Sequence, residues 1–172
     1  MKVFGIAGYS GSGKTTLLVR LLPLIIARGL SVSTLKHAHH TFEIDQPGKD
    51  SHSHRQAGAT EVMIASAQRW ALIHDIEAEP EPSVEELQAH MTPVDLLLIE
   101  GFKDGPHAKL EVHREATGKP LLQPDDRHIV AIASDTEIEA SRDIPVPRLA
   151  LDDTAAIVDF VLAHCGLDGA RA

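Results

Sequence analysis

The feature that most constrains this chain is a phosphate-binding pattern near its start. Residues 8–15 read Gly-Tyr-Ser-Gly-Ser-Gly-Lys-Thr, a complete match to G-x-x-x-x-G-K-[ST]. The apolar segment 2–7 before it is typical of a strand, and the segment 16–22 after it is typical of a helix. A glycine-rich turn without a ligand is the alternative, but this strand–loop–helix context favours a nucleoside triphosphate site.

Each residue type in the pattern has a function in holding phosphate. Glycines let the backbone fold tightly, so that its N–H groups converge on phosphate oxygens. The start of the following helix adds unpaired N–H groups and the positive end of its dipole. Lys14 is the catalytic candidate here, because it can reach the β- and γ-phosphates, and the Thr15 hydroxyl is a candidate Mg²⁺ ligand.

The remaining chain alternates strand and helix patterns. We expect strands at 2–7, 31–36, 61–66, 69–74, 95–101, 109–114, 128–133 and 146–151, and helices at 14–28, before Gly58, after Ser83 and at 153–165. This order predicts an α/β protein of the P-loop NTPase type, with a mostly parallel sheet flanked by helices. At 172 residues the chain is the length of one nucleotide-binding domain.

A small β extension is expected beyond this sheet, around 67–76 and 106–115. The segment 109–114 alternates polar and apolar residues, as a half-exposed strand does. Such an extension would have an open edge, and open edges are commonly paired or covered. The sequence therefore offers a reason for a homodimer, although it does not say which edge is used.

Charge and composition exclude several classes of partner. Sixteen basic against 25 acidic residues give a net charge of −9, whereas nucleic acids and anionic membranes attract basic proteins. The single cysteine, Cys165, cannot form an intramolecular disulfide, and no run of residues is long enough to span a bilayer. We expect a cytoplasmic protein that binds neither nucleic acid nor membrane.

Two acidic residues flank the apolar segment 95–100, and their positions predict different roles. About five strand residues at ~3.3 Å each place Asp95 and Glu100 about 16 Å apart. Ligands in parallel sheets bind at the carboxyl ends of the strands, which is where Glu100 lies. We therefore expect Glu100 to bind Mg²⁺ or a Mg²⁺-bound water and Asp95 to be structural. The alternative is a strand-end Glu100 in solvent.

A long polar segment, rich in histidine, follows the second predicted strand. It begins with Lys36-His37-Ala38-His39-His40 and continues past Lys49. Three interpretations remain open: a metal site, a solvated loop, or a mobile segment that covers the phosphates. We favour the last, in which Lys36, His37 and Lys49 contact anions, and it predicts that Lys49→Ala weakens triphosphate binding more than diphosphate binding.

These segments together resemble the molybdopterin-guanine dinucleotide biosynthesis protein B (MobB) family of GTP-binding proteins. The matching blocks are Gly-Tyr-Ser-Gly-Ser-Gly-Lys-Thr-Thr at 8–16, Lys-His-Ala-His-His at 36–40, Asp-Gln-Pro-Gly-Lys-Asp-Ser at 45–51, Ser66–Trp70, Ile-Glu-Gly-Phe-Lys at 99–103 and Glu-Val-His-Arg at 111–114. The phosphate loop is shared by very many proteins, but the other blocks together are specific. They cover nearly the whole chain in order.

The resemblance implies GTP and Mg²⁺ as cofactors, at best weak GTPase activity and a homodimer. It also implies an adapter role beside the guanylyltransferase that attaches GMP to molybdopterin, and beside molybdopterin-containing proteins. The residues that it places at the nucleotide are Gly11, Ser12, Gly13, Lys14, Thr15, Thr16, Asp45, Lys49, Asp50, Glu100, Gly101, Phe102 and Lys103.

Recognition of guanine has weaker support in the residues. The chain contains no Asn-Lys-x-Asp motif to bind the base. Asp135, which follows the predicted strand 128–133, could accept hydrogen bonds from the N1–H and amino group of guanine. An Asp135→Asn protein that keeps its preference for GTP over ATP would refute this assignment.

The alternative function is a small-molecule kinase that transfers the γ-phosphoryl group to an acceptor. Fast phosphoryl-transfer enzymes usually have an arginine and a residue that orients the nucleophile. Arginines occur at 55, 69 and 114 but in no recognisable lid helix, and no glutamine follows Glu100-Gly101. Both absences favour a poor catalyst, with His37 and His39 as the only nearby candidates to orient water.

Overall fold

The computed structural model describes residues 1–38, 42–76, 80–138 and 144–169. The chain divides into two compact units, one formed by Met1–His37 with Met91–Ala172 and the other by Ala38–His90. Each unit is described by itself. No helix within these described ranges is long and apolar enough to cross a bilayer.

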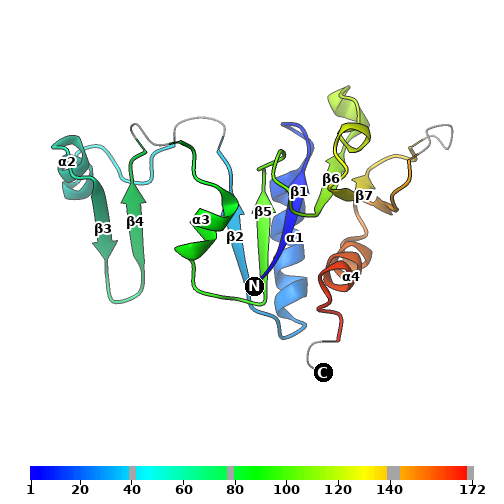
Figure 1. The fold of residues 1–172 in the computed structure, drawn as a ribbon, viewed down its shortest axis with the longest axis horizontal. Helices are drawn as coiled ribbons and strands as arrows, with labels where there is room; N and C mark the ends of the chain where they lie inside the picture. The colour runs from blue at the N-terminus through cyan, green and yellow to red at the C-terminus, as the bar shows by residue number, and fades with distance from the viewer. Residues whose placement is uncertain (39–41, 77–79, 139–143, 170–172) are drawn as a thin grey trace. The chain divides into compact units, whose positions relative to one another are not determined.

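The first unit is built on a six-stranded sheet in which every neighbouring pair is parallel. The strand order is β2 (Val32–Lys36), β5 (Leu96–Glu100), β1 (Lys2–Ala7), β6 (Lys109–His113), β7 (Ile129–Ser134), β8 (Arg148–Ala150). The predicted mostly parallel α/β sheet is confirmed, and all carboxyl ends meet at one edge (Figure 1).

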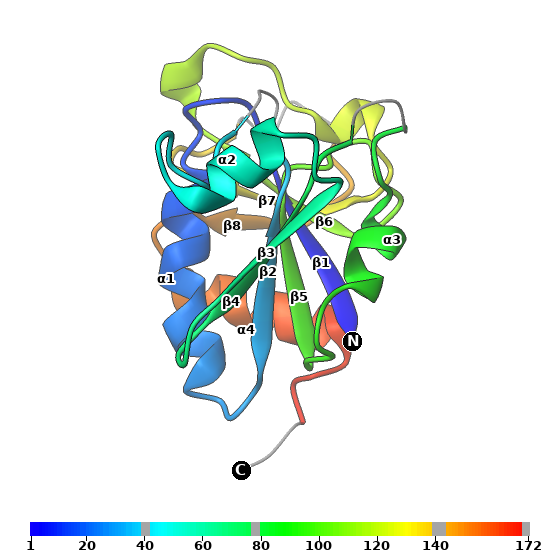
Figure 2. The same cartoon turned by 90° about the vertical axis from the view of Figure 1, so that its left-hand side faces the viewer.

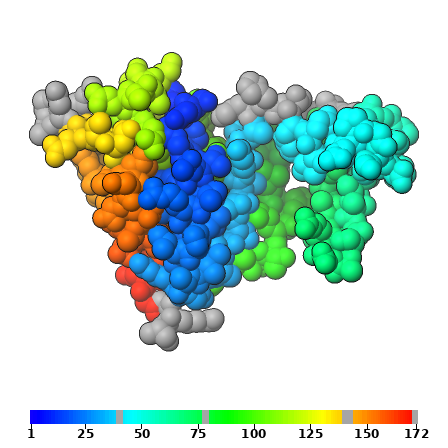
Figure 3. Space-filling model, turned by 180° about the vertical axis from the view of Figure 1, so that it is seen from behind, coloured from blue at the N-terminus to red at the C-terminus, as the bar shows by residue number. Residues whose placement is uncertain are grey.

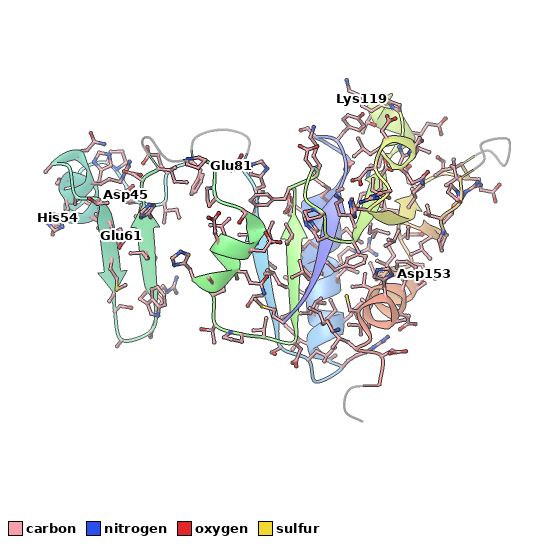
Figure 4. The ribbon with its side chains drawn as sticks, in the orientation of Figure 1. Asp45, His54, Glu61, Glu81, Lys119 and Asp153 are labelled. Atoms are coloured by element: carbon pink, nitrogen blue, oxygen red, sulfur yellow. The ribbon has the colours of Figure 1, made fainter. Side chains whose placement is uncertain are left out.

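Two helices cover one face of this sheet. α1 (Lys14–Ile26) and α4 (Thr154–Cys165) pack against each other and share an apolar core with β1, β5 and β6 (Figures 2 and 3). α4 starts where the Asp153 side chain accepts a hydrogen bond from the Ala156 N–H (Figure 4). It ends at Gly166, whose φ of 66° is left-handed, as expected for a helix stop.

The central strand β5 explains how a chain with few aromatic residues builds a core. All five of its residues, Leu-Leu-Leu-Ile-Glu, are buried, because β1 and β2 pair with its two edges and side chains cover both faces. A continuous apolar run of this length is the pattern expected of a fully buried parallel strand. Its final residue, Glu100, therefore ends in a sheltered position at the carboxyl edge.

The second unit consists of two short helices and a hairpin. Strands β3 (Glu61–Ala65) and β4 (Trp70–His74) pair antiparallel, and α2 (Asp50–Gln56) precedes them. α3 (Val84–Ala89) begins with the predicted capping box, in which Ser83 and Glu86 exchange hydrogen bonds. The hairpin forms a separate two-stranded sheet.

The prediction that 106–115 belongs to a β extension is wrong. β6 lies inside the main sheet between β1 and β7, so this segment supplies no open edge for a dimer. Its polar residues are buried with partners: Lys109 Nζ donates to the carbonyls of Lys103 and Gly105 at 2.7 and 2.6 Å and pairs with Asp126. An alternation of polar and apolar residues indicates an exposed face only when the polar side chains have water as their hydrogen-bond partner. Here their partners are protein groups.

Glu111 is the second buried polar residue of β6. Its carboxylate accepts the N–H groups of Leu122 and Gln123 at 2.8 and 2.9 Å, next to the short 3-10 helix η2 (Gln123–Asp125). Burial raises the pKa of the Glu111 carboxyl above its ordinary value. The side chain therefore fixes the segment after β6 against the sheet.

Candidate nucleotide-binding site

The phosphate loop has the backbone geometry that its sequence predicts. Gly8 and Gly13 have φ values of 143° and 95°, which side chains rarely adopt. A Cβ on Gly8 would lie 2.5 Å from the carbonyl oxygen of Val112 and 2.8 Å from Ser12 Oγ. Glycine is therefore required where the loop passes β6. Helix α1 begins directly after Gly13, so its first N–H groups border the loop.

The Lys14 side chain folds back onto the start of the phosphate loop. Its Nζ donates hydrogen bonds to the carbonyls of Gly8 and Tyr9 at 2.8 and 2.9 Å. Partial burial lowers the pKa of Lys14, an effect that the nearby Glu100 opposes and Lys36 reinforces. An incoming anion would favour the charged ammonium, so this lysine is positioned to gain from phosphate binding.

Thr15 and Glu100 are in contact although they lie 85 positions apart in the sequence. The Thr15 hydroxyl donates to Glu100 Oε1 at 2.7 Å, and Lys36 Nζ lies 3.5 Å from the same oxygen. Glu100 is only 8% exposed, which contradicts the alternative of a solvated strand-end residue. The structure thus brings the two candidate Mg²⁺ ligands together.

Asp95 has the structural role that its position predicts. Its Oδ2 accepts hydrogen bonds from the backbone N–H of Ser31 at 2.8 Å and from the Ser31 hydroxyl at 2.6 Å. These contacts fix the start of β5 to the segment before β2. They lie at the opposite end of β5 from Glu100.

The turn after β5 places two more candidates beside Glu100. Gly101 has a φ of 97°, and a Cβ there would lie 2.8 Å from the Cβ of His37. Phe102 follows with a φ of 45°, and its ring stacks on the His37 imidazole with centroids 4.5 Å apart. The His37 backbone N–H also donates to the Glu100 carbonyl at 2.8 Å. The ends of β2 and β5 are therefore in close contact.

Lys103 and His39 are two further candidates from the sequence. The carbonyl of Lys103 is held by buried Lys109, so this part of the 101–108 loop is anchored through its backbone. His39 lies outside the described residues. Within those residues, no group of three or more His, Cys, Asp or Glu side chains is arranged to hold a metal ion.

Asp45 has a partner that the sequence did not reveal. It is buried in the second unit, where its carboxylate accepts hydrogen bonds from Arg55 Nη2 and Nε at 3.0 and 3.2 Å (Figure 4). The same guanidinium pairs with Glu43 and Asp75. Hydrogen bonding from Arg55 is the main cause that lowers the pKa of Asp45.

Lys49 and Asp50 also belong to the second unit. Lys49 is the N-cap residue of α2, and Asp50 stands in its first turn, where a negative charge favours the helix dipole. Contact of these two residues and of Asp45 with a nucleotide stays a prediction.

A pocket of about 730 Å³ opens at the carboxyl ends of β7 and β8. Its volume lies within the range of small-molecule sites. Ser134, Asp135 and Thr136 line it, together with Arg114. Asp135, the candidate base-reading residue, accepts hydrogen bonds from Arg114 Nη1 at 3.1 Å and from the Glu115 N–H at 3.3 Å.

Arg114 is the site residue that the sequence interpretation missed. Its Nε donates to the Ser12 carbonyl at 3.0 Å, so it touches the phosphate loop as well as Asp135. The sequence shows only that Arg114 lies in no recognisable lid helix. Arg114 directly follows β6, at the carboxyl end of a strand that neighbours β1, and this adjacency is visible only in the structure.

Comparison with known proteins gives one consistent family. The family described as "Molybdopterin guanine dinucleotide synthesis protein B" matches residues 3–135. The "Molybdopterin-guanine dinucleotide biosynthesis adapter protein" of Escherichia coli is 40% identical over 159 residues, covering 91% of this chain and 89% of that protein. The protein of the same name from Haemophilus influenzae is 40% identical over 162 residues, covering 92% and 86%.

Solved structures agree with this comparison. The crystal structure of Bacillus subtilis MobB matches with a TM-score of 0.68 and 28% identity, covering 96% of this chain and 98% of the other. The MobB homologue from Bacillus stearothermophilus has a TM-score of 0.69 at 21% identity, covering 96% and 99%, and supports the fold alone.

Proposed function

This chain belongs to the molybdopterin guanine dinucleotide synthesis protein B family, and we propose that it is a GTP-binding adapter in the biosynthesis of that dinucleotide. The relatives from E. coli and H. influenzae are named as adapter proteins of this biosynthesis. GTP and Mg²⁺ are the proposed cofactors. A homodimer and the enzyme that attaches GMP to molybdopterin are the proposed partners, in the cytoplasm.

The observation that carries the proposal is the meeting of Thr15 and Glu100 beside Lys14. The hydroxyl and the carboxylate supply oxygen ligands, which Mg²⁺ prefers, and Lys14 supplies a positive charge for the phosphates. Mg²⁺ at nucleotide sites takes few protein ligands, because phosphate oxygens and water complete its shell. Thr15 would bind the ion directly, and Glu100 directly or through water. When bound, the ion would neutralise charge on the phosphates.

The pocket lined by Arg114 and Asp135 is the proposed compartment for the nucleoside. It opens at the carboxyl edge of the sheet, as the phosphate loop does, and its wall includes Asp135. A carboxylate can accept hydrogen bonds from the N1–H and amino group of guanine, whereas adenine carries no hydrogen at N1. This chemistry supports GTP over ATP.

Slow hydrolysis accords better with an adapter than with an efficient enzyme. Of the two histidines that could orient water, His37 packs its ring against Phe102, and packing restrains its movement. Arg114 contacts the loop through the Ser12 carbonyl and is engaged with Asp135. We therefore expect a protein that retains GTP long enough to act through its bound state.

Calorimetric titration with GTP, GDP and ATP, with and without Mg²⁺, tests the binding proposal. We expect Mg²⁺-dependent binding of GTP that Lys14→Ala abolishes and the exposed-surface control Lys119→Ala retains. The absence of saturable GTP binding would contradict the proposal. A pull-down of the guanylyltransferase in each nucleotide state tests the adapter role, and formation of a phosphorylated molybdopterin would instead indicate a kinase.

A further inference from the structure

We propose that Arg114 is a positioning residue that couples the base end of the bound nucleotide to the phosphate loop. This inference rests on the proposed function, because it assumes that the pocket beside Asp135 receives the nucleoside. Arg114 contacts the phosphate loop through Nε and the Asp135 side chain in the pocket wall through Nη1.

The first contact fixes Arg114 to the phosphate loop. Nε donates to the carbonyl of Ser12 at 3.0 Å, and a Cβ on Gly13 would lie 3.2 Å from the same nitrogen. Gly13 is the N-cap residue of α1. The guanidinium therefore lies against the turn from which the helix begins, and the Ser12 carbonyl of the phosphate loop holds it in place.

The second contact fixes Arg114 to the wall of the pocket. Nη1 donates to Asp135 Oδ2 at 3.1 Å, while the N–H of Glu115 donates to Oδ1 at 3.3 Å. Both oxygens of Asp135 are thus oriented by the start of one segment, residues 114–115. A base that binds the Asp135 carboxylate would therefore influence the position of Arg114, because both bind the same carboxylate.

The backbone around Arg114 restrains it on both sides. Strand β6 precedes it, and the 3-10 helix η1 (Glu115–Thr117) follows. The Arg114 carbonyl accepts hydrogen bonds from the Thr117 hydroxyl at 2.7 Å and from the Thr117 N–H at 3.0 Å. A planar guanidinium held in this way presents Nε and Nη1 in fixed directions, which a lysine ammonium cannot reproduce.

The test compares GTP with inorganic tripolyphosphate, which has the phosphates but no base. Calorimetry with Mg²⁺ would give both dissociation constants for the wild type, Arg114→Lys, Asp135→Asn and the double variant. Arg28→Lys is the matched control, because Arg28 forms a surface ion pair with Asp159 after the far end of α1. Thermal unfolding of each variant monitors the fold.

Arg114→Lys keeps the positive charge, so we expect it to weaken GTP about tenfold while tripolyphosphate binding stays nearly unchanged. Asp135→Asn leaves the contact with Ser12 in place and should produce a similar selective loss. The double variant should bind GTP no more weakly than the weaker-binding of the two single variants, because the two residues act through one contact.

Three outcomes would overturn the inference. Equal losses for GTP and tripolyphosphate in Arg114→Lys would make Arg114 a simple phosphate contact or a structural residue. Additive losses of about a hundredfold in the double variant would mean independent action. An unchanged GTP affinity in Arg114→Lys would remove its role. If the wild type binds neither GTP nor tripolyphosphate, the proposed function itself is overturned. If it binds both, the variants test the role of Arg114 separately from the proposed function.

Discussion

Thr15 Oγ1 lies 2.7 Å from Glu100 Oε1, which joins the residue after the phosphate-loop lysine to the last residue of β5. The contact is possible because β1 and β5 are parallel neighbours, with Ile6 opposite Glu100. Both strands therefore deliver their following residues to the same edge. The proposed Mg²⁺ site depends on that adjacency.

Glu100→Gln tests whether this pair serves a metal ion. An amide keeps the size of the side chain but loses the negative charge that attracts Mg²⁺. We expect the gain in GTP affinity on adding Mg²⁺ to fall by about tenfold or more. The exposed Glu85→Gln should behave as the wild type in titrations with and without a chelator. An undiminished Mg²⁺ effect in Glu100→Gln would exclude this role.

Lys49→Ala tests the interpretation of the segment after β2 as a cover for the phosphates. Removing this charge should weaken GTP binding more than GDP binding, because the γ-phosphate carries the additional negative charge. The control is Lys119→Ala, measured with both nucleotides. Equal losses for GTP and GDP at Lys49 would leave the segment as a solvated loop or a metal site.

Gly101→Ala tests the close approach of the turn after β5 to β2. An alanine there would be strained at a φ of 97° and would also meet the Cβ of His37 at 2.8 Å. We expect a loss of about 2–4 kcal/mol in the free energy of unfolding. Gly118→Ala has a φ of 61° with no atom within 4 Å of the added Cβ, so it isolates the backbone cost. Urea denaturation should show the larger loss at Gly101, and equal losses would contradict the steric argument.

The Asp45–Arg55 pair predicts a pH dependence of the second unit. The pKa of Asp45 is lower in the folded state than its ordinary value of 3.8, so the folded state favours the ionised carboxylate. Its contribution to stability is present above pH 3.8 and is lost as the pH falls through the folded pKa. Asp45→Asn should be less stable than the wild type at pH 7, and this difference should shrink at acid pH.

Trp70 makes this measurement specific, because it is the single tryptophan of the chain and lies on β4. Its fluorescence during urea unfolding reports on the second unit. Asp159→Asn removes an exposed ion pair of the first unit and serves as the control. A stability difference that is constant between pH 7 and pH 3 would contradict a role for the Asp45 charge.

The parts of the fold that sequence could predict are those with local signals. The phosphate loop, the buried run of β5 and the cap of α3 each follow from adjacent residues whose chemistry admits few alternatives. The assignment of Asp95 and Glu100 to opposite ends of a strand needed only strand geometry.

The parts that sequence could not predict depend on contacts between distant segments. Lys109 and Glu111 look like the outer face of a half-exposed strand until Asp126 and the backbone at 122–123 are brought against them. The pairing of Asp45 with Arg55 is a second example, because neither residue gives a local sign of it. Arg114 could be located at the phosphate loop only once β6 was known to neighbour β1.

Lys109 has a consequence for how the chain tolerates mutation. Its side chain has no exposed surface, and its ammonium joins two main-chain carbonyls and one carboxylate. A neutral replacement would leave three oxygen acceptors facing one another without a proton between them. In a comprehensive substitution library, this lysine should therefore rank among the least replaceable positions, although its residue type is ordinarily among the most freely exchanged.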